Sequence, residues 1–122
     1  MTSFHAPCHT RGHILFYIEA KEHAEEQFYG KKDEENNDYC VYNKILFTGD
    51  TTFIGGTGRF FEGNAQEMAR NVDYIMDLPN STQIFCGHDY LKGNISFAQG
   101  IEKEHEPYES LLKKAELRSS EN

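Results

Sequence analysis

The sequence predicts an α/β protein in which helices follow short buried strands. Three apolar runs, residues 14–18, 44–47 and 83–86, are each typical of a strand buried within a sheet. A glycine-rich turn and an amphipathic helical pattern separate the second run from the third, and further helical patterns follow the third. This alternation of strands and helices is typical of a layered α/β arrangement.

The strand runs are apolar throughout rather than alternating, as in "ILFYI" at residues 14–18. Between the first two runs, residues 19–43 contain eight acidic residues and few aliphatic ones. Such a composition buries too little apolar surface to form a core. We therefore interpret residues 19–43 as an acidic, solvated surface insertion.

A helix is predicted to begin after Asn64, whose side chain can cap it, with Glu67 placed three residues on for a capping box. It is expected to end before Pro79. Four residues form its apolar stripe and are expected to pack in the core: Met68, Val72, Ile75 and Met76.

Two more helical patterns begin at about Asn94 and after Pro107. Apolar stripes of this kind usually pack in a core. The first stripe comprises Ile95, Phe97, Ala98 and Ile101, and the second comprises Leu111, Leu112, Ala115 and Leu117.

Length and charge limit the functions that this chain can have. Its 122 residues suffice for one domain or part of one, and the net charge of −8 disfavours nucleic acid or an anionic membrane as a partner. No apolar run approaches the roughly 20 residues that span a bilayer, and the N-terminal residues do not resemble a secretory signal. Three scattered cysteines argue against a disulfide framework. We expect a cytoplasmic location.

Polar residues follow two of the predicted strands at the point where each strand ends. Asp50 comes directly after the second strand and the pair Thr48-Gly49, and His88 comes after the third strand and Gly87. In layered α/β proteins ligands gather at this edge of the sheet. His9 precedes the first strand, in a segment whose proline and glycine argue against a helix.

Taken singly, each of these residues has a simpler explanation, because a histidine beside a strand is usually a surface residue and Gly-Asp after a strand is often only a turn. Together, two imidazoles and one carboxylate match the ligands that hold zinc or iron, and a carboxylate can bridge two ions. The glycines around Asp50 allow tight turns and a close approach to the backbone.

The segments "APCHTRGH", "FTGDTTFIGGTGRFFEG" and "CGHDY", in that order, resemble the second half of the catalytic domain of glyoxalase II. This family, the hydroxyacylglutathione hydrolases, belongs to the metallo-β-lactamase superfamily. The resemblance runs from about residue 5 to about residue 101. It implies that residues 1–122 form a partial domain, the C-terminal half of an αββα sandwich, with 94–122 as the start of a C-terminal helical region.

The resemblance also implies roles for single residues. His9 would bind a first metal ion, His88 a second, and Asp50 would bridge both. His13 would support or pack against these ligands rather than coordinate. The implied cofactors are two divalent ions, zinc in the first instance, with iron or manganese as alternatives.

Contacts to the substrate are implied for Arg59, Phe61 and Tyr90. The fixed fork of donors of Arg59 suits a peptide carboxylate or carbonyl. Relatives commonly have Tyr at the position of Phe61, which puts one hydroxyl contact to glutathione in doubt. The implied reaction is attack of metal-activated hydroxide on the thioester of an S-acylglutathione such as S-lactoylglutathione, giving lactate and glutathione. Cys8 and Cys86 adjoin these residues and are expected to pack rather than react.

One family motif, THxHxDH, which would supply four further ligands, is absent from these 122 residues. We therefore expect the isolated chain to be inactive without a missing N-terminal half, and to expose the inner face of its sheet. Two alternatives remain open: a persulfide dioxygenase of the same fold, against which residues 60–63 ("FFEG") argue, and a non-catalytic remnant that acts as an interaction module.

Overall fold

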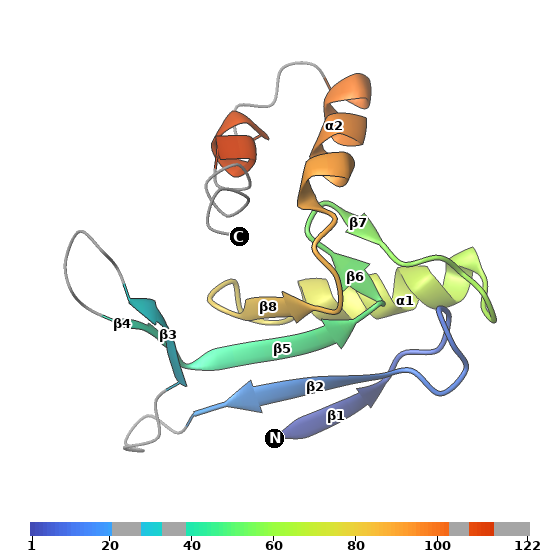
Figure 1. Cartoon of the computed structure of the whole chain (residues 1–122). Helices are drawn as coiled ribbons and strands as arrows, with labels where there is room; N and C mark the ends of the chain where they lie inside the picture. The colour runs from blue at the N-terminus through green and yellow to red at the C-terminus, as the bar shows by residue number, and fades with distance from the viewer. Residues whose placement is uncertain (21–27, 33–38, 103–107, 114–122) are drawn as a thin grey trace.

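The computed structural model describes residues 1–20, 28–32, 39–102 and 108–113 (Figure 1). It is a mixed α/β structure in which helices follow strands, as predicted. The strands are β1 (Thr2–His5), β2 (Ile14–Glu19), β3 (Phe28–Lys32), β4 (Tyr39–Tyr42), β5 (Lys44–Gly49), β6 (Thr52–Phe53), β7 (Gly56–Thr57) and β8 (Gln83–Cys86). The helices are α1 (Ala65–Met76) and α2 (Leu91–Ile101), and residues 108–113 are also helical.

The main sheet contains all three predicted strands side by side, in the order β1-β2-β5-β8. β2 lies antiparallel to both β1 and β5, whereas β5 and β8 are parallel. Parallel pairing places the carboxyl ends of β5 and β8 at the same edge of the sheet. The sequence patterns did not predict the edge strand β1, which has only one large apolar residue, Phe4, between polar neighbours.

Helix α1 covers one face of the sheet (Figure 1). Its capping box is confirmed, because the Asn64 side chain accepts from the Glu67 N–H and the Glu67 carboxylate accepts from the Asn64 N–H. The prediction for Met76 was wrong, since that side chain is 75% exposed. At 100° per residue, position 76 lies beside the face that carries Met68 and Ile75. The core under the helix comprises Ala6, Leu15 and Leu46, with Phe4, Tyr17, Tyr74, Ile75 and Leu78 packed against them.

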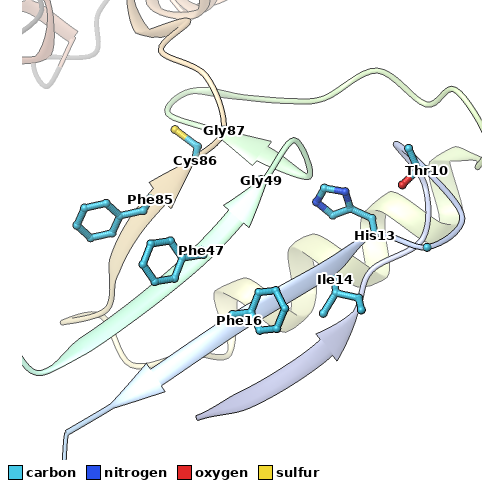
Figure 2. A pocket seen from close by; sticks show the side chains of 10 residues that line it. Thr10, His13, Ile14, Phe16, Phe47, Gly49, Phe85, Cys86 and Gly87 are labelled. Atoms are coloured by element: carbon cyan, nitrogen blue, oxygen red, sulfur yellow. The ribbon is translucent and has the colours of Figure 1, made fainter.

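The opposite face of the main sheet is apolar and uncovered within the described residues. Figure 2 shows Phe16, Phe47 and Phe85 side by side on it, from β2, β5 and β8. These three side chains and Ile14 are 41–45% exposed. They line an open depression of about 490 Å³ that extends to His13 at the strand ends. Within the described ranges, one face of the sheet is therefore exposed, as expected.

The predicted insertion at residues 19–43 contains more regular structure than its composition indicated. β3 and β4 pair as an antiparallel hairpin, with Phe28 opposite Tyr42 and Tyr29 opposite Val41. These aromatic and β-branched residues favour strands despite the surrounding charge. Residues 21–27 and 33–38 of the insertion lie outside the described residues.

Helix α2 begins at Leu91, three residues before the predicted start at Asn94. Leu91 and Ile95 are its buried residues, and a second small core forms where Tyr108, Leu111 and Leu112 pack on them. The predictions for Phe97 and Ile101 were wrong, because the contact surface of α2 is one narrow strip and both side chains lie outside it, 72% and 69% exposed. Ala115 and Leu117 lie outside the described residues. None of the described helices has the length and apolar character needed to cross a membrane.

Candidate metal centre

Three predicted site residues converge at the edge of the sheet where β5 and β8 end. Asp50 follows β5, His88 follows β8, and His9 lies in the loop between β1 and β2. The Nε2 atom of His9 lies 3.4 Å from Oδ2 of Asp50, and the Nε2 atom of His88 lies 3.3 Å from the same oxygen. Residues that are distant in sequence thus meet at one carboxylate oxygen.

A backbone hydrogen bond sets the orientation of the His9 ring. Nδ1 of His9 donates to the carbonyl oxygen of Arg59 at 2.9 Å. In a neutral imidazole the other nitrogen, Nε2, then carries a lone pair and no proton. That lone pair faces the Asp50 carboxylate, and two acceptors at this distance repel each other unless a proton or a metal cation lies between them. The arrangement is compatible with a cation between the two groups.

The loop that carries His9 is held by two glutamates. The backbone N–H of Arg11 donates to Oε2 of Glu62 at 2.5 Å, and its guanidinium donates to Glu67 at 3.0 Å. In return, the Glu62 N–H donates to the carbonyl of Cys8 at 3.2 Å. Because Glu67 also closes the capping box of α1, the His9 loop is attached to the start of that helix.

The surroundings of His88 are aromatic instead. The His88 ring stacks on Tyr90, with ring centroids 5.3 Å apart and planes at 25°. Phe53 meets Tyr90 edge to face at 4.9 Å and lies 6.1 Å from His88. Among the described residues, Nδ1 of His88 has no hydrogen-bond partner, so aromatic packing is its main restraint.

Three glycines let these residues approach one another. Gly49 has φ +50°, a left-handed conformation, and a side chain there would meet the His13 ring at 2.8 Å. A side chain at Gly58 would collide with the backbone of Asp50, and one at Gly87 would collide with the Asp50 carboxylate. The glycine-rich sequence around Asp50 is therefore a steric requirement of this site.

His13 lies near the centre but is engaged elsewhere. Its Nε2 donates to the carbonyl of Thr48 at 3.0 Å, and its ring centroid is 6.0 Å from that of His9. A nitrogen that donates to a carbonyl is not free to bind a metal. This hydrogen bond engages Nε2 only, so the supporting role of His13 stays a prediction.

The predicted substrate residues lie around the centre. Phe61 is 67% exposed and packs edge to face on the His9 ring, with centroids 5.0 Å apart. Tyr90 is 52% exposed on the His88 side. Arg59 is exposed and, within the described part of the chain, its guanidinium makes no hydrogen bond or ion pair. Their roles in binding substrate stay predictions.

The donor set fits part of a site for two ions. In tetrahedral zinc sites with bonds of about 2.0–2.2 Å, ligand atoms lie about 3.3–3.6 Å apart. The two His-to-Asp50 distances, 3.4 and 3.3 Å, match that edge. Within the described ranges, no three His, Cys, Asp or Glu side chains are grouped to hold a single ion. The donors instead form two pairs that share Oδ2 of Asp50, which would give each ion two ligands.

The neighbouring cysteines are not arranged as nucleophiles. Cys8 is fully buried, and this burial, together with the nearby Glu67 carboxylate, raises the pKa of its thiol. The thiol of Cys86 donates to the carbonyl of His88 at 3.3 Å. The thiol of Cys8 donates to the carbonyl of Asn64 at 3.4 Å, so both cysteines bond to local backbone.

Sequence reasoning did not single out Phe53 and did not predict the contact of Glu62 with the His9 loop. Glu62 acts through a hydrogen bond to a loop 51 residues away, and no periodic pattern indicates such a pair. Phe53 lies in the short strand β6, which the glycine-rich composition concealed.

The mixed α/β fold, with a strand sheet and helices after the strands, is consistent with a fragment of a metallo-β-lactamase-type domain. No family model matches the chain. It is 39% identical over 101 residues to the cytoplasmic hydroxyacylglutathione hydrolase of Arabidopsis thaliana, covering 82% of this chain and 32% of that protein. It is 41% identical over 102 residues to the hydroxyacylglutathione hydrolase of Dictyostelium discoideum, covering 83% and 32%.

A hydroxyacylglutathione hydrolase-like protein of Gallus gallus is 34% identical over 117 residues, covering 95% of this chain and 36% of that protein. The chain therefore spans about a third of the length of the curated relatives that it matches. Over that span it is a homologue of the hydroxyacylglutathione hydrolases, the glyoxalase II family.

Proposed function

We propose that this chain supplies part of the metal centre and of the substrate site of a hydrolase that acts on S-acylglutathione thioesters. The observation that carries the proposal is the approach of two imidazole Nε2 atoms to one carboxylate oxygen at the carboxyl ends of parallel strands. The substrate class follows from the names of the relatives.

His9, Asp50 and His88 are the proposed ligands. His9 is oriented by the Arg59 carbonyl, and His88 by Tyr90, so that each presents Nε2 toward the shared oxygen. Bound divalent ions, zinc in the first instance with iron or manganese as alternatives, would supply Lewis acidity and activated water.

The proposed reaction is hydrolysis of the thioester. Water adds to the acyl carbonyl, the carbon–sulfur bond breaks, and the products are a hydroxy acid and glutathione; S-lactoylglutathione would give lactate. The thiolate is a good leaving group, so no strong protein acid is required. Covalent catalysis by Cys8 is disfavoured, because its thiol is buried and stays protonated near neutral pH.

Substrate binding is proposed for the exposed residues on either side of the centre. The guanidinium of Arg59 would bind a carboxylate or carbonyl of the glutathione moiety. Phe61 and Tyr90 present apolar ring surface beside His9 and His88 respectively. A cytoplasmic location is also proposed, because the name of the Arabidopsis relative describes that protein as cytoplasmic.

We expect little thioesterase activity from the 122 residues alone. Each ion would have two ligands from the described residues, whereas zinc sites use four positions, of which at least three are protein ligands in catalytic sites. The proposed partner is a segment that corresponds to the N-terminal half of such a domain, which would complete the ligands and cover the apolar sheet face.

Complementation tests this function. The chain would be co-expressed with the remaining two thirds of the Arabidopsis relative, and hydrolysis of S-lactoylglutathione by the purified complex would be followed. We expect activity that Asp50→Asn abolishes and that Asp73→Asn, a change on the exposed side of α1, leaves intact. A stable complex that contains zinc and hydrolyses no thioester would contradict the proposal.

The uncovered face of Phe16, Phe47 and Phe85 favours a second candidate, a non-catalytic module that binds a protein partner through this sheet. Metal analysis by mass spectrometry separates the two candidates. An interaction module should contain no stoichiometric metal even after purification in the presence of zinc.

A further inference from the structure

We propose that Phe53 is a positioning residue for His88 and acts through the ring of Tyr90. The inference rests on the proposed function, because it concerns how one of the two proposed histidine ligands is held. It extends that function by assigning a role to a residue outside the donor set.

The need for such a residue follows from the difference between the two histidines. His9 is oriented by a hydrogen bond from Nδ1 to a backbone carbonyl, and its side chain is 18% exposed. The side chain of His88 is 53% exposed, and within the described residues its only polar ring contact is the one to Asp50. An imidazole without a partner on its second nitrogen can rotate, which would move Nε2 away from the shared oxygen.

Three aromatic contacts among Phe53, Tyr90 and His88 limit that rotation, the direct one between Phe53 and His88 being the longest at 6.1 Å. The Tyr90 ring lies nearly parallel to the His88 ring, at 5.3 Å and 25°. Phe53 meets Tyr90 almost perpendicularly, at 4.9 Å and 83°. Edge-to-face packing of this kind fixes the plane of a ring as well as its place. Phe53 therefore fixes Tyr90, and Tyr90 fixes His88.

The position of Phe53 is itself determined by the fold. Phe53 lies in the β6–β7 hairpin, and the Nδ2 atom of Asn94, on helix α2, donates to the carbonyl of Ile54 at 3.0 Å. At the base of the hairpin, the Thr48 hydroxyl donates to the carbonyl of Thr52 at 2.9 Å. The backbone N–H of Asn94 donates to the carbonyl of Tyr90 at 3.0 Å, so one helical turn connects Tyr90 to the residue that holds the hairpin.

The experiment observes the histidine rings in the metal-free chain. With ¹³C-labelled histidine, ring carbon–proton spectra would be compared for the unchanged chain, Phe53→Leu, Phe53→Tyr and the control Phe97→Leu. Phe97 is a 72% exposed ring on α2 without a described aromatic partner. We expect Phe53→Leu to shift the His88 signal and leave the His9 signal in place. Phe53→Tyr should keep the His88 signal where the unchanged chain has it, and Phe97→Leu should shift neither histidine signal.

Zinc titration of the same proteins gives a second readout. Loss of an aromatic pair should weaken zinc binding about 3- to 10-fold in Phe53→Leu and leave Phe97→Leu unchanged. If the chain alone binds no zinc, the ring spectra still test Phe53, and the proposed function is decided separately by the complementation experiment. An unmoved His88 signal in Phe53→Leu overturns the inference. If that variant does not fold, nuclear Overhauser contacts in the unchanged chain decide: absence of Phe53–Tyr90 and Tyr90–His88 contacts also overturns it.

Discussion

The two sides of the proposed metal centre are held by different kinds of interaction. On the His9 side, hydrogen bonds and charged groups attach the loop to Glu62 and to the start of α1. On the His88 side, the restraint is a stack of aromatic rings open to solvent. A hydrogen bond fixes the direction of a ring nitrogen, whereas aromatic packing fixes the plane of the ring without using a polar partner. We expect the His9 side to be the more rigid of the two.

Removing the shared carboxylate should have the largest effect because it acts on both sides. Zinc sites in peptides gain about 10–16 kcal/mol from four ligands, so one ligand contributes about 3 kcal/mol, or roughly 100-fold in affinity. Zinc titration of the chain should show this loss in Asp50→Ala at every bound ion. His9→Ala and His88→Ala should each weaken one ion only. Equal losses from all three variants would argue against a shared ligand.

A smaller effect is expected from Gly49→Ala, which strains the strand end between the two sides. A left-handed backbone and contact with the His13 ring should lower the free energy of unfolding by about 2 kcal/mol. Urea denaturation measures this change. In a His13→Ala background, Gly49→Ala should lower the free energy of unfolding by less, because the new methyl group no longer meets the His13 ring. Strictly additive losses of stability would show that this methyl group and the ring do not collide.

Glu62→Ala tests the hydrogen bond that attaches the His9 loop to Glu62. Loss of the acceptor for the Arg11 N–H should cost about 1–2 kcal/mol of stability and broaden the ring signal of His9, but not that of His88. Glu62→Gln retains an acceptor oxygen and serves as the matched control. A change in the His88 signal of similar size would mean that the two sides are mechanically coupled.

Thiol alkylation provides the mildest test of the difference in rigidity. Cys8, beside His9, is buried, whereas Cys86, near His88, is partly exposed. Under native conditions Cys86 should react with iodoacetamide at least about 10-fold faster than Cys8, because Cys8 needs local opening and has a raised pKa. Peptide mass spectrometry resolves the two rates. Equal rates would indicate that the His9 loop opens readily.

Much of the fold could be predicted from the sequence because its signals are local. The capping box at Asn64 and the three apolar runs each depend on neighbouring residues, and all are present. β1 and β6 could not be predicted, since short edge strands owe their pairing to partners elsewhere. Met76 and Phe97 show that an apolar residue near a helical stripe need not face the core.

The donor types and their places at strand ends were also visible in the sequence. What could not be predicted is how the proposed ligands are held, because the contacts of Glu62 and Phe53 join residues that are far apart in the sequence. These contacts form only in the folded chain, in which β5 pairs with β8 and the β1–β2 loop lies near their carboxyl ends.

The most direct test of the shared oxygen is a crystal structure of the zinc-soaked chain with anomalous diffraction at the zinc edge. Our account predicts two zinc peaks, one bonded to Nε2 of His9 and one to Nε2 of His88, each about 2.0–2.2 Å from the Asp50 carboxylate. A single peak bonded to both imidazoles, or zinc bound away from Asp50, would contradict it.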